Sequence, residues 1–343
     1  MSGVSKRLGV RLRLVAMLCA SLAGIVGCAP QVAPVSSANL GWLRKNTTAR
    51  QRGEFSKGDV PSHFPLRLPP GAFVRLPLDT SHQIPVVPGE LDGKALPWIV
   101  DSGAAYPVLV DAQSAVEAGL RTIENVGVRG VGVGGQTQLL LGRFRELSLG
   151  GRSVLGPGVA GILMQNYRIT FAGIPWKRMP LNLFGLPLLE QFSHVTFDGP
   201  AREVTFSRAG RYKPRVGAFS VPFTRAADRL WVDLLIGGHR VRAFLDTGCG
   251  SALRLSPASM QGIPQECFAV PHGKTRRAMG VGGVETEEVG VLKHLDLGDL
   301  RLRRVEYDTH PNSEENILGW GAFFRVRVTL DFVRNRMWVE LAE

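Results

Sequence analysis

Hydrophobic and polar residues alternate along most of this chain in short runs, and glycine, proline, asparagine and aspartate separate the runs. Alternation with a period of two is typical of β-strands that bury one face. Only short stretches, such as residues 111–119, have the pattern of a helix. The 41 glycines and 22 prolines fit a chain with many turns. We therefore predict an all-β fold.

The same succession of landmarks occurs twice. An apolar strand ends at Asp101 and another ends at Asp246, and each follows a turn pair, Asp92-Gly93 or Gly237-Gly238. We expect each stretch to be a β-hairpin whose second strand delivers the aspartate. Four further landmarks follow in the same order in both repeats: a glycine-rich turn, a Leu-x-Leu-Gly strand, an apolar pair followed by glycine, and a strand that ends in aspartate. In the first repeat they lie at residues 131–135, 147–150, 183–185 and 195–198. In the second repeat they lie at residues 279–283, 295–298, 317–319 and 328–331.

This order indicates a tandem duplication. We expect one β-rich lobe at residues 71–208, a second at residues 216–343, and a linker at residues 209–215. At 343 residues the chain is long enough for both lobes to bury a core.

Both aspartates begin a short motif, Asp101-Ser102-Gly103 and Asp246-Thr247-Gly248. These motifs, with the landmarks around them, resemble the retropepsin-like aspartic proteases over almost all residues beyond about 71. The resemblance implies an all-β, bilobal acid-protease fold with the active site between two pseudo-symmetric lobes. It also implies a monomer, because both lobes lie in one chain.

The chemistry explains the residue types in the motif. Two carboxyl groups about 3 Å apart cannot both ionise cheaply, so they share a proton. One can then activate a water while the other donates to a carbonyl oxygen. By the resemblance, the hydroxyls of Ser102 and Thr247 lock the two loops together. Further glycines are expected to let backbone approach the loops, beside the carboxylates and from behind: Gly103, Gly248, Gly185 and Gly319.

The glycine-rich turns are candidate flaps over a substrate, one from each lobe. Their glycines are Gly132, Gly134 and Gly135 in the first repeat and Gly280, Gly282 and Gly283 in the second. After the motif glycines stand Ala104 and Cys249, where related enzymes carry a hydroxyl that lowers the pKa of the carboxylate. We therefore expect a pH optimum nearer neutral. Extra residues near 166–180 in the first repeat could form a lid or be loop decoration.

The N-terminus has the pattern of a targeting segment. Basic residues precede an apolar run that ends at Gly27-Cys28, which resembles a bacterial lipoprotein signal. We expect a signal peptide at residues 1–27, lipidation of Cys28, and a tether at residues 28–70. Ala29 favours the outer membrane, facing the periplasm. An ordinary secretory signal is the alternative.

Other chemistries have weaker support. The formal net charge is +12, but no basic helix or basic-aromatic stripe accompanies it, so we expect no nucleic-acid partner. The pattern at residues 130–135 also satisfies a dinucleotide fingerprint, yet strand-like sequence follows it. The histidines are dispersed, and we expect neither metal nor cofactor. Cys249 has no evident histidine partner that would make it a nucleophile, and a disulfide with Cys267 stays open.

These patterns predict an aspartic endopeptidase that hydrolyses envelope or periplasmic polypeptides bound in an extended form. The alternative is a bilobal lipoprotein that binds peptides or a partner without turnover.

Overall fold

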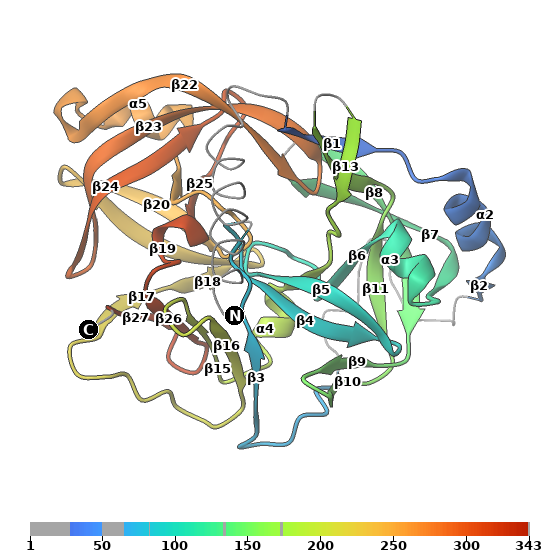
Figure 1. Cartoon of the computed structure of the whole chain (residues 1–343). Helices are drawn as coiled ribbons and strands as arrows, with labels where there is room; N and C mark the ends of the chain where they lie inside the picture. The colour runs from blue at the N-terminus through green and yellow to red at the C-terminus, as the bar shows by residue number, and fades with distance from the viewer. Residues whose placement is uncertain (1–27, 50–64, 82, 133–134, 172–173, 342–343) are drawn as a thin grey trace, which may run out of the picture.

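The computed structural model describes residues 28–49, 65–81, 83–132, 135–171 and 174–341. These residues form two β-rich lobes and a sheet that both lobes share (Figure 1). The fold is all-β and bilobal, as the alternating pattern predicted. The expected signal peptide lies outside the described residues.

The first lobe is built on a ten-stranded sheet. Its strands, in sheet order, are β10 (Arg152–Leu155), β9 (Leu147–Leu149), β4 (Val86–Leu91), β5 (Lys94–Asp101), β14 (Leu183–Gly185), β6 (Val108–Asp111), β11 (Gly158–Leu163), β8 (Gly135–Phe144), β7 (Arg121–Gly132) and β2 (Thr47–Thr48).

The second lobe repeats this arrangement in an eight-stranded sheet. Its strands, in sheet order, are β18 (Thr224–Ala226), β19 (Arg229–Ile236), β20 (His239–Asp246), β25 (Asn316–Gly319), β21 (Leu253–Arg254), β24 (Leu300–Thr309), β23 (Gly283–Leu297) and β22 (Phe268–Gly280).

The third sheet joins the lobes, with three strands from each repeat. Its order is β17 (Phe219–Pro222), β27 (Arg336–Glu340), β26 (Arg327–Asp331), β15 (His194–Asp198), β16 (Glu203–Ser207) and β3 (Phe73–Pro77). The two central strands, β15 and β26, are antiparallel, and Thr196 faces Thr329 with their hydroxyls 2.9 Å apart. The pseudo-two-fold axis between the repeats therefore passes through this pair.

The predicted hairpins are present in both lobes. β4 pairs with β5, and β19 pairs with β20. Both turn residues of each hairpin have positive φ: 52° at Asp92, 83° at Gly93, 58° at Gly237 and 85° at Gly238. Positive φ at both positions matches the right-handed twist of the strands that a two-residue turn connects. Each hairpin therefore holds the end of its second strand, and so the aspartate, in a fixed position.

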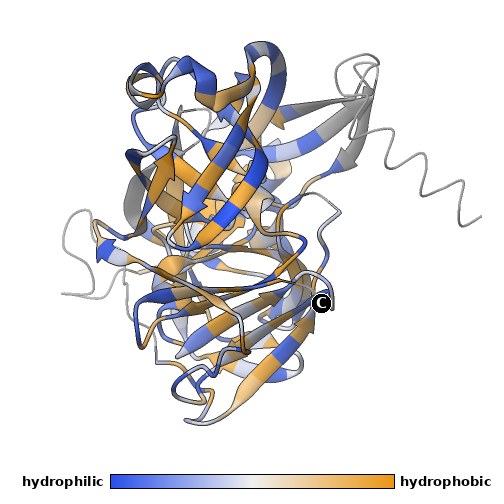
Figure 2. Cartoon of the chain, turned by 90° about the vertical axis from the view of Figure 1, so that its left-hand side faces the viewer, coloured by the Kyte–Doolittle hydropathy of each residue, from blue (hydrophilic) through white to orange (hydrophobic). Residues whose placement is uncertain are grey.

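Hydrophobic and hydrophilic positions alternate along several strands (Figure 2), and successive side chains of a strand point to opposite faces of its sheet. In β5, Trp98 and Val100 are fully buried in the main core, where Trp98 stacks on Phe184 with ring centroids 4.4 Å apart. Ile99 and Asp101 therefore point to the other side, where Ile99 joins a separate apolar cluster. This alternation presents Asp101 to the space between the lobes.

The segment expected to be a tether is folded where the structure describes it, so that expectation is wrong for residues 28–49. β1 (Cys28–Ala33) pairs with β12 (Asn166–Phe171), and α2 (Ser37–Lys45) buries Leu43 in the main core. β13 (Ile174–Arg178) completes a three-stranded sheet with them. The pairing partner of β1 lies more than 130 residues away, which a local pattern does not reveal.

Helices are short. The predicted helix at residues 111–119 is α3 (Ala112–Glu117), and Asp111 caps it by accepting a hydrogen bond from the amide of Ser114. The other helices among the described residues are α2, α4 (Leu186–Leu189), α5 (Pro257–Gly262) and two 3-10 turns, η1 (Gln265–Cys267) and η2 (Trp320–Ala322). In the described part of the chain, no helix is sufficiently long and apolar to span a membrane.

Candidate active site

Asp101 and Asp246 are the last residues of equivalent strands. β5 lies parallel to β14, with Asp101 beside Gly185, and β20 lies parallel to β25, with Asp246 beside Gly319. Both aspartates are partly exposed, as groups that act on a substrate must be. The two repeats therefore deliver one carboxyl group each from the same position of the same framework.

The two carboxyl groups meet between the lobes. The Asp101 side chain is hydrogen-bonded to that of Asp246. Each carboxyl also lies against the opposite motif glycine: a Cβ on Gly103 would stand 2.4 Å from Cγ of Asp246, and a Cβ on Gly248 would stand 2.4 Å from Cγ of Asp101. No real side chain tolerates such contacts, so both motifs need glycine at these positions.

The motif hydroxyls lock the two loops together. The amide of Ser102 donates to Oγ1 of Thr247 at 2.9 Å, and the amide of Thr247 donates to Oγ of Ser102 at 3.0 Å. Each hydroxyl then donates to a carbonyl across the interface, Ser102 to Leu245 at 2.9 Å and Thr247 to Val100 at 2.6 Å. These four buried hydrogen bonds fix the separation of the two aspartates.

Backbone amides from the same loops orient the carboxyls. The amides of Gly103 and Ala104 donate to Oδ1 of Asp101 at 2.8 and 3.0 Å. Those of Gly248 and Cys249 act on Asp246 in the same way. The arrangement of each loop is thus repeated in the other.

Burial raises the pKa of Asp101 well above its ordinary value, and the neighbouring Asp246 raises it further. Burial also raises the pKa of Asp246, but the hydrogen bond from Asp101, the Gly248 amide and the Arg229 guanidinium lower it. The two carboxyls therefore titrate as one coupled pair that shares a proton. Two carboxyls with one proton between them can provide an acid and a base at the same time.

Gly185 and Gly319 close the site from behind. A Cβ on Gly185 would lie 1.8 Å from the carbonyl oxygen of Tyr106, and one on Gly319 would lie 2.1 Å from that of Ser251. Both contacts are with the chain that continues from an aspartate motif. These two glycines therefore allow that chain to cross directly behind the motif.

Both glycine-rich turns lie at the ends of hairpins. β7 and β8 pair up to Gly132 and Gly135, and β22 and β23 pair up to Gly280 and Gly283, with Gly282 in the turn. Gly134 lies outside the described residues. At the second tip, Val281 packs against the apolar cluster of the first lobe.

A profile of the family described as aspartyl protease matches residues 87–165 and 232–322, one region in each lobe. Each lobe therefore carries a region of the aspartyl protease family. Each matched region contains one of the two aspartates and the strand that ends at it. A comparison with curated proteins gives no match.

The extra residues of the first repeat contact the second glycine-rich turn. Tyr167, on β12, is almost fully buried, and its hydroxyl donates to the carbonyl of Val281 at 2.8 Å. The sheet of β1, β12 and β13 thus lies beside the β22–β23 hairpin (Figure 1). Sequence reasoning noted Tyr167 only as part of an extra segment, because its partner belongs to the other lobe.

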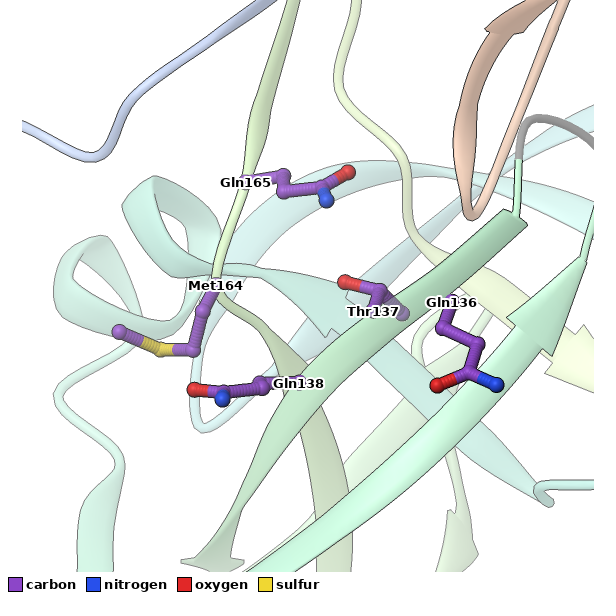
Figure 3. Close-up of a pocket in the computed structure, with 5 residues that line it drawn as sticks. All are labelled: Gln136, Thr137, Gln138, Met164 and Gln165. Atoms are coloured by element: carbon purple, nitrogen blue, oxygen red, sulfur yellow. The ribbon is translucent and has the colours of Figure 1, made fainter.

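A hollow of about 550 Å³ lies on the flap strand β8. Gln136, Thr137 and Gln138 line it from that strand, and Met164 and Gln165 line it from the connection between β11 and β12 (Figure 3). Neither aspartate lines it. It is a polar recess beside the first flap, separate from the carboxyl pair.

Neither Cys249 nor Cys267 forms a disulfide, and the Cys249 thiol is not activated as a nucleophile. Cys249 and Cys267 are free, and burial raises the pKa of the Cys249 thiol to about 12, which keeps it protonated at neutral pH. Cys28 begins β1. Among the described residues, no group of three or more His, Cys, Asp or Glu is placed to hold a metal ion.

Arg229 is a site residue that the sequence analysis missed. Its guanidinium lies 4.0 Å from the ring centroid of Phe244, pairs with Glu315 at 3.1 Å, and lowers the pKa of Asp246. The first lobe has Ile84 at the equivalent position of its hairpin. An alignment of the two repeats could have revealed this difference from the sequence, because it places Arg229 opposite Ile84.

Proposed function

We propose that the protein is an aspartic endopeptidase, in which Asp101 and Asp246 activate a water molecule that attacks a peptide carbonyl. The observation that supports this most strongly is the hydrogen-bonded pair of carboxyls at the pseudo-two-fold axis, with raised pKa values and two loops locked by Ser102 and Thr247. A structural aspartate pair would have no need of partial exposure.

The proposed reaction needs one proton on the pair. The ionised member of the pair takes a proton from the water as the water oxygen bonds to the carbonyl carbon. The protonated member donates its proton to the carbonyl oxygen, which gives a neutral tetrahedral diol. The C–N bond then breaks as the nitrogen receives the proton taken from the water, and the diol returns a proton to the carboxyl that donated one. The products are a carboxylic acid and an amine, and the pair regains its first state.

The substrate is an extended polypeptide. Each lobe carries one long hairpin, β7–β8 or β22–β23, whose strand edges can hydrogen-bond to an extended chain. Flexible or unfolded segments therefore suit the site better than folded domains. We further propose that Cys28 carries a lipid anchor that holds the enzyme at the periplasmic face of the outer membrane.

The test is cleavage of an unfolded polypeptide by the full chain in detergent, beside Asp101→Asn and Asp246→Asn. We expect fragments from the unmodified chain, whereas each variant should lose at least about 1,000-fold in kcat. Equal cleavage by all three proteins would refute the proposal. Binding without cleavage by the unmodified chain would favour a peptide-binding protein instead.

A further inference from the structure

The two lobes offer opposite chemistry to a chain that crosses the carboxyl pair. The strand pairings define which positions are equivalent, because Asp101 stands beside Gly185 as Asp246 stands beside Gly319. Asn182 and Asn316 support the same alignment, since each donates its amide to the carbonyl four residues before its aspartate, that of Pro97 or Arg242.

The first-lobe wall is apolar. We define it by six residues around Asp101 that are fully or partly buried: Ile84, Ile99, Leu109, Leu139, Leu181 and Leu183. They form one cluster, apart from the main core, on the face of the sheet that carries Asp101. Ala104 and Tyr106 of the aspartate loop pack against this cluster. A side chain placed here meets hydrocarbon.

The second-lobe wall consists of the six equivalent positions: Arg229, Phe244, Arg254, Glu287, Glu315 and Ile317. Four of the six apolar residues are replaced by charged ones. Arg229 pairs with Glu315, and Arg254 pairs with Glu287. The second pair is buried, with 6% of Arg254 and 0% of Glu287 exposed.

The six wall positions carry two arginines and two glutamates, and the ion pairs that they enter add more carboxyl than guanidinium groups. Arg254 pairs with Asp308 at 2.7 Å and Glu285 at 2.9 Å, and Arg276 pairs with Glu287 at 3.1 Å, Asp308 at 2.6 Å and Glu306 at 2.8 Å. Together with the Arg229–Glu315 pair, these ion pairs join three guanidinium groups to five carboxyl groups. The guanidinium groups belong to Arg229, Arg254 and Arg276, and the carboxyl groups belong to Glu285, Glu287, Glu306, Asp308 and Glu315.

The first lobe acts as an internal control for this wall. Buried ions cost desolvation energy, and apolar residues of similar size often replace them without loss of stability. The first lobe has leucine at the positions of Arg254 and Glu287, so the framework itself does not require charge there. The second wall therefore retains buried charge at a position where the fold is stable without it.

The carboxyl pair lies between the two walls, so the difference between an apolar and a charged wall can determine which substrate side chains are preferred. An extended substrate crosses the pseudo-two-fold axis at the bond to be cut, so the side chains on its two sides meet equivalent positions of opposite lobes. We propose that the enzyme prefers a bond between a large apolar residue, held by the first-lobe wall, and a basic residue, held by the second-lobe wall, and that it rejects acidic residues at the second. This inference rests on the proposed function.

The first experiment is a cleavage-site profile of the full chain in detergent on a mixture of unfolded proteins, read by mass spectrometry. We expect Leu, Phe or Met on one side of the cut bond and Lys or Arg on the other, each enriched about tenfold over Glu and Asp. Equal enrichment of apolar residues on both sides, or enrichment of acidic residues on either, would overturn the proposal.

A variant then assigns the preference to the wall. Arg229→Ile with Glu315→Leu gives the second lobe the residues of the first, and we expect it to lose the preference for Lys over Leu on the basic side alone. Arg301→Ile with Asp296→Leu is the matched control, because it removes an ion pair from the opposite end of the β23–β24 hairpin. An unchanged profile in the first variant, or the same change in the control, would contradict the assignment.

Binding separates this inference from the proposed function. Labelled hexapeptides with Leu-Lys, Leu-Glu or Leu-Leu at the centre are titrated with the Asp101→Asn chain, and anisotropy is recorded. We expect the Leu-Lys peptide to bind about tenfold more tightly than the Leu-Glu peptide. If the unmodified chain cuts nothing but this order holds, only the proposed function fails. If the three peptides bind alike, or none binds, the inference fails.

Discussion

Ser102 and Thr247 exchange hydrogen bonds across the lobe interface, each hydroxyl accepting the backbone amide of the other residue. The two hydroxyls are buried, and each also donates to a carbonyl of the opposite strand. The separation of Asp101 and Asp246 therefore depends on two small side chains that never need to touch the substrate. This arrangement makes them positioning residues for the proposed reaction.

Replacing Thr247 by Val should destabilise the protein and weaken catalysis together. The substitution keeps the shape but leaves the amide of Ser102 and the carbonyl of Val100 without their partner, at a cost of about 1–3 kcal/mol. Displaced carboxyls should also lower kcat about 10- to 100-fold. Urea unfolding and steady-state kinetics measure both. Thr247→Ser, which keeps the hydroxyl, is the control; equal loss in Val and Ser variants would show that the hydrogen bonds are not responsible.

Alanine at Gly185 or Gly319 should distort the loops that carry the aspartates. The new Cβ would overlap a backbone carbonyl oxygen, of Tyr106 or of Ser251, and backbone cannot rotate aside as a side chain can. We expect a loss of about 1–3 kcal/mol in the free energy of unfolding and a drop in kcat. Gly273→Ala, on β22 with no atom within 4 Å of its Cβ, should change neither. Normal activity in Gly185→Ala would contradict the close approach.

Arg254→Met should unfold the second lobe more easily. The variant leaves the carboxylates of Glu287 and Asp308 buried without this partner, and breaking such a network from one side costs about 3–5 kcal/mol. Arg301→Met removes an exposed arginine that pairs with Asp296, and we expect little change there. Denaturant unfolding compares the two. Similar midpoints would mean that the buried network contributes no more than a surface pair.

Asp101→Asn should stabilise the protein increasingly as the pH rises. The raised pKa means that the folded state keeps a proton that the unfolded state releases near pH 4, so the unmodified protein loses stability from about pH 4 up to the raised pKa. Asparagine cannot ionise and avoids this loss. Thermal unfolding across this range measures the difference, with Asp299→Asn on an exposed turn as the control. A difference that shrinks as the pH rises would contradict a raised pKa of Asp101 in the folded protein.

The local framework of the site could be predicted from the sequence because it is encoded in short motifs. Alternation in residues 94–101 and 239–246, the turn pairs before them, and the repeated order of landmarks were sufficient to place both aspartates at strand ends. The hairpin turns confirm this at Asp92 and Gly237, both with positive φ. Each of these features depends on residues close together in the chain. The expectation that the hydroxyls of Ser102 and Thr247 lock the two loops together came from the resemblance to the retropepsin-like proteases.

Other features depend on partners far away in the chain. Residues 28–49 looked like a tether because β1 gains its partner only from β12, and Leu43 gains its core only from the first lobe. Tyr167 contacts Val281 across the lobes, and Arg254 meets Glu287 only when β21 and β23 are brought together. The local hydrophobic periodicity of the sequence does not predict contacts between residues so far apart in the chain. An alignment of the two repeats helps to find such residues, because it shows the positions at which the two lobes differ.

The pH dependence of kcat/KM is the most direct test of the shared proton. Since burial raises the pKa of both carboxyls, and Ala104 and Cys249 supply no hydroxyl to lower them, the singly protonated pair should persist to a higher pH than two ordinary carboxyls would. The account predicts a bell-shaped profile with its maximum nearer neutral than strongly acid pH. A maximum at strongly acid pH, or a profile with a single limb, would contradict it.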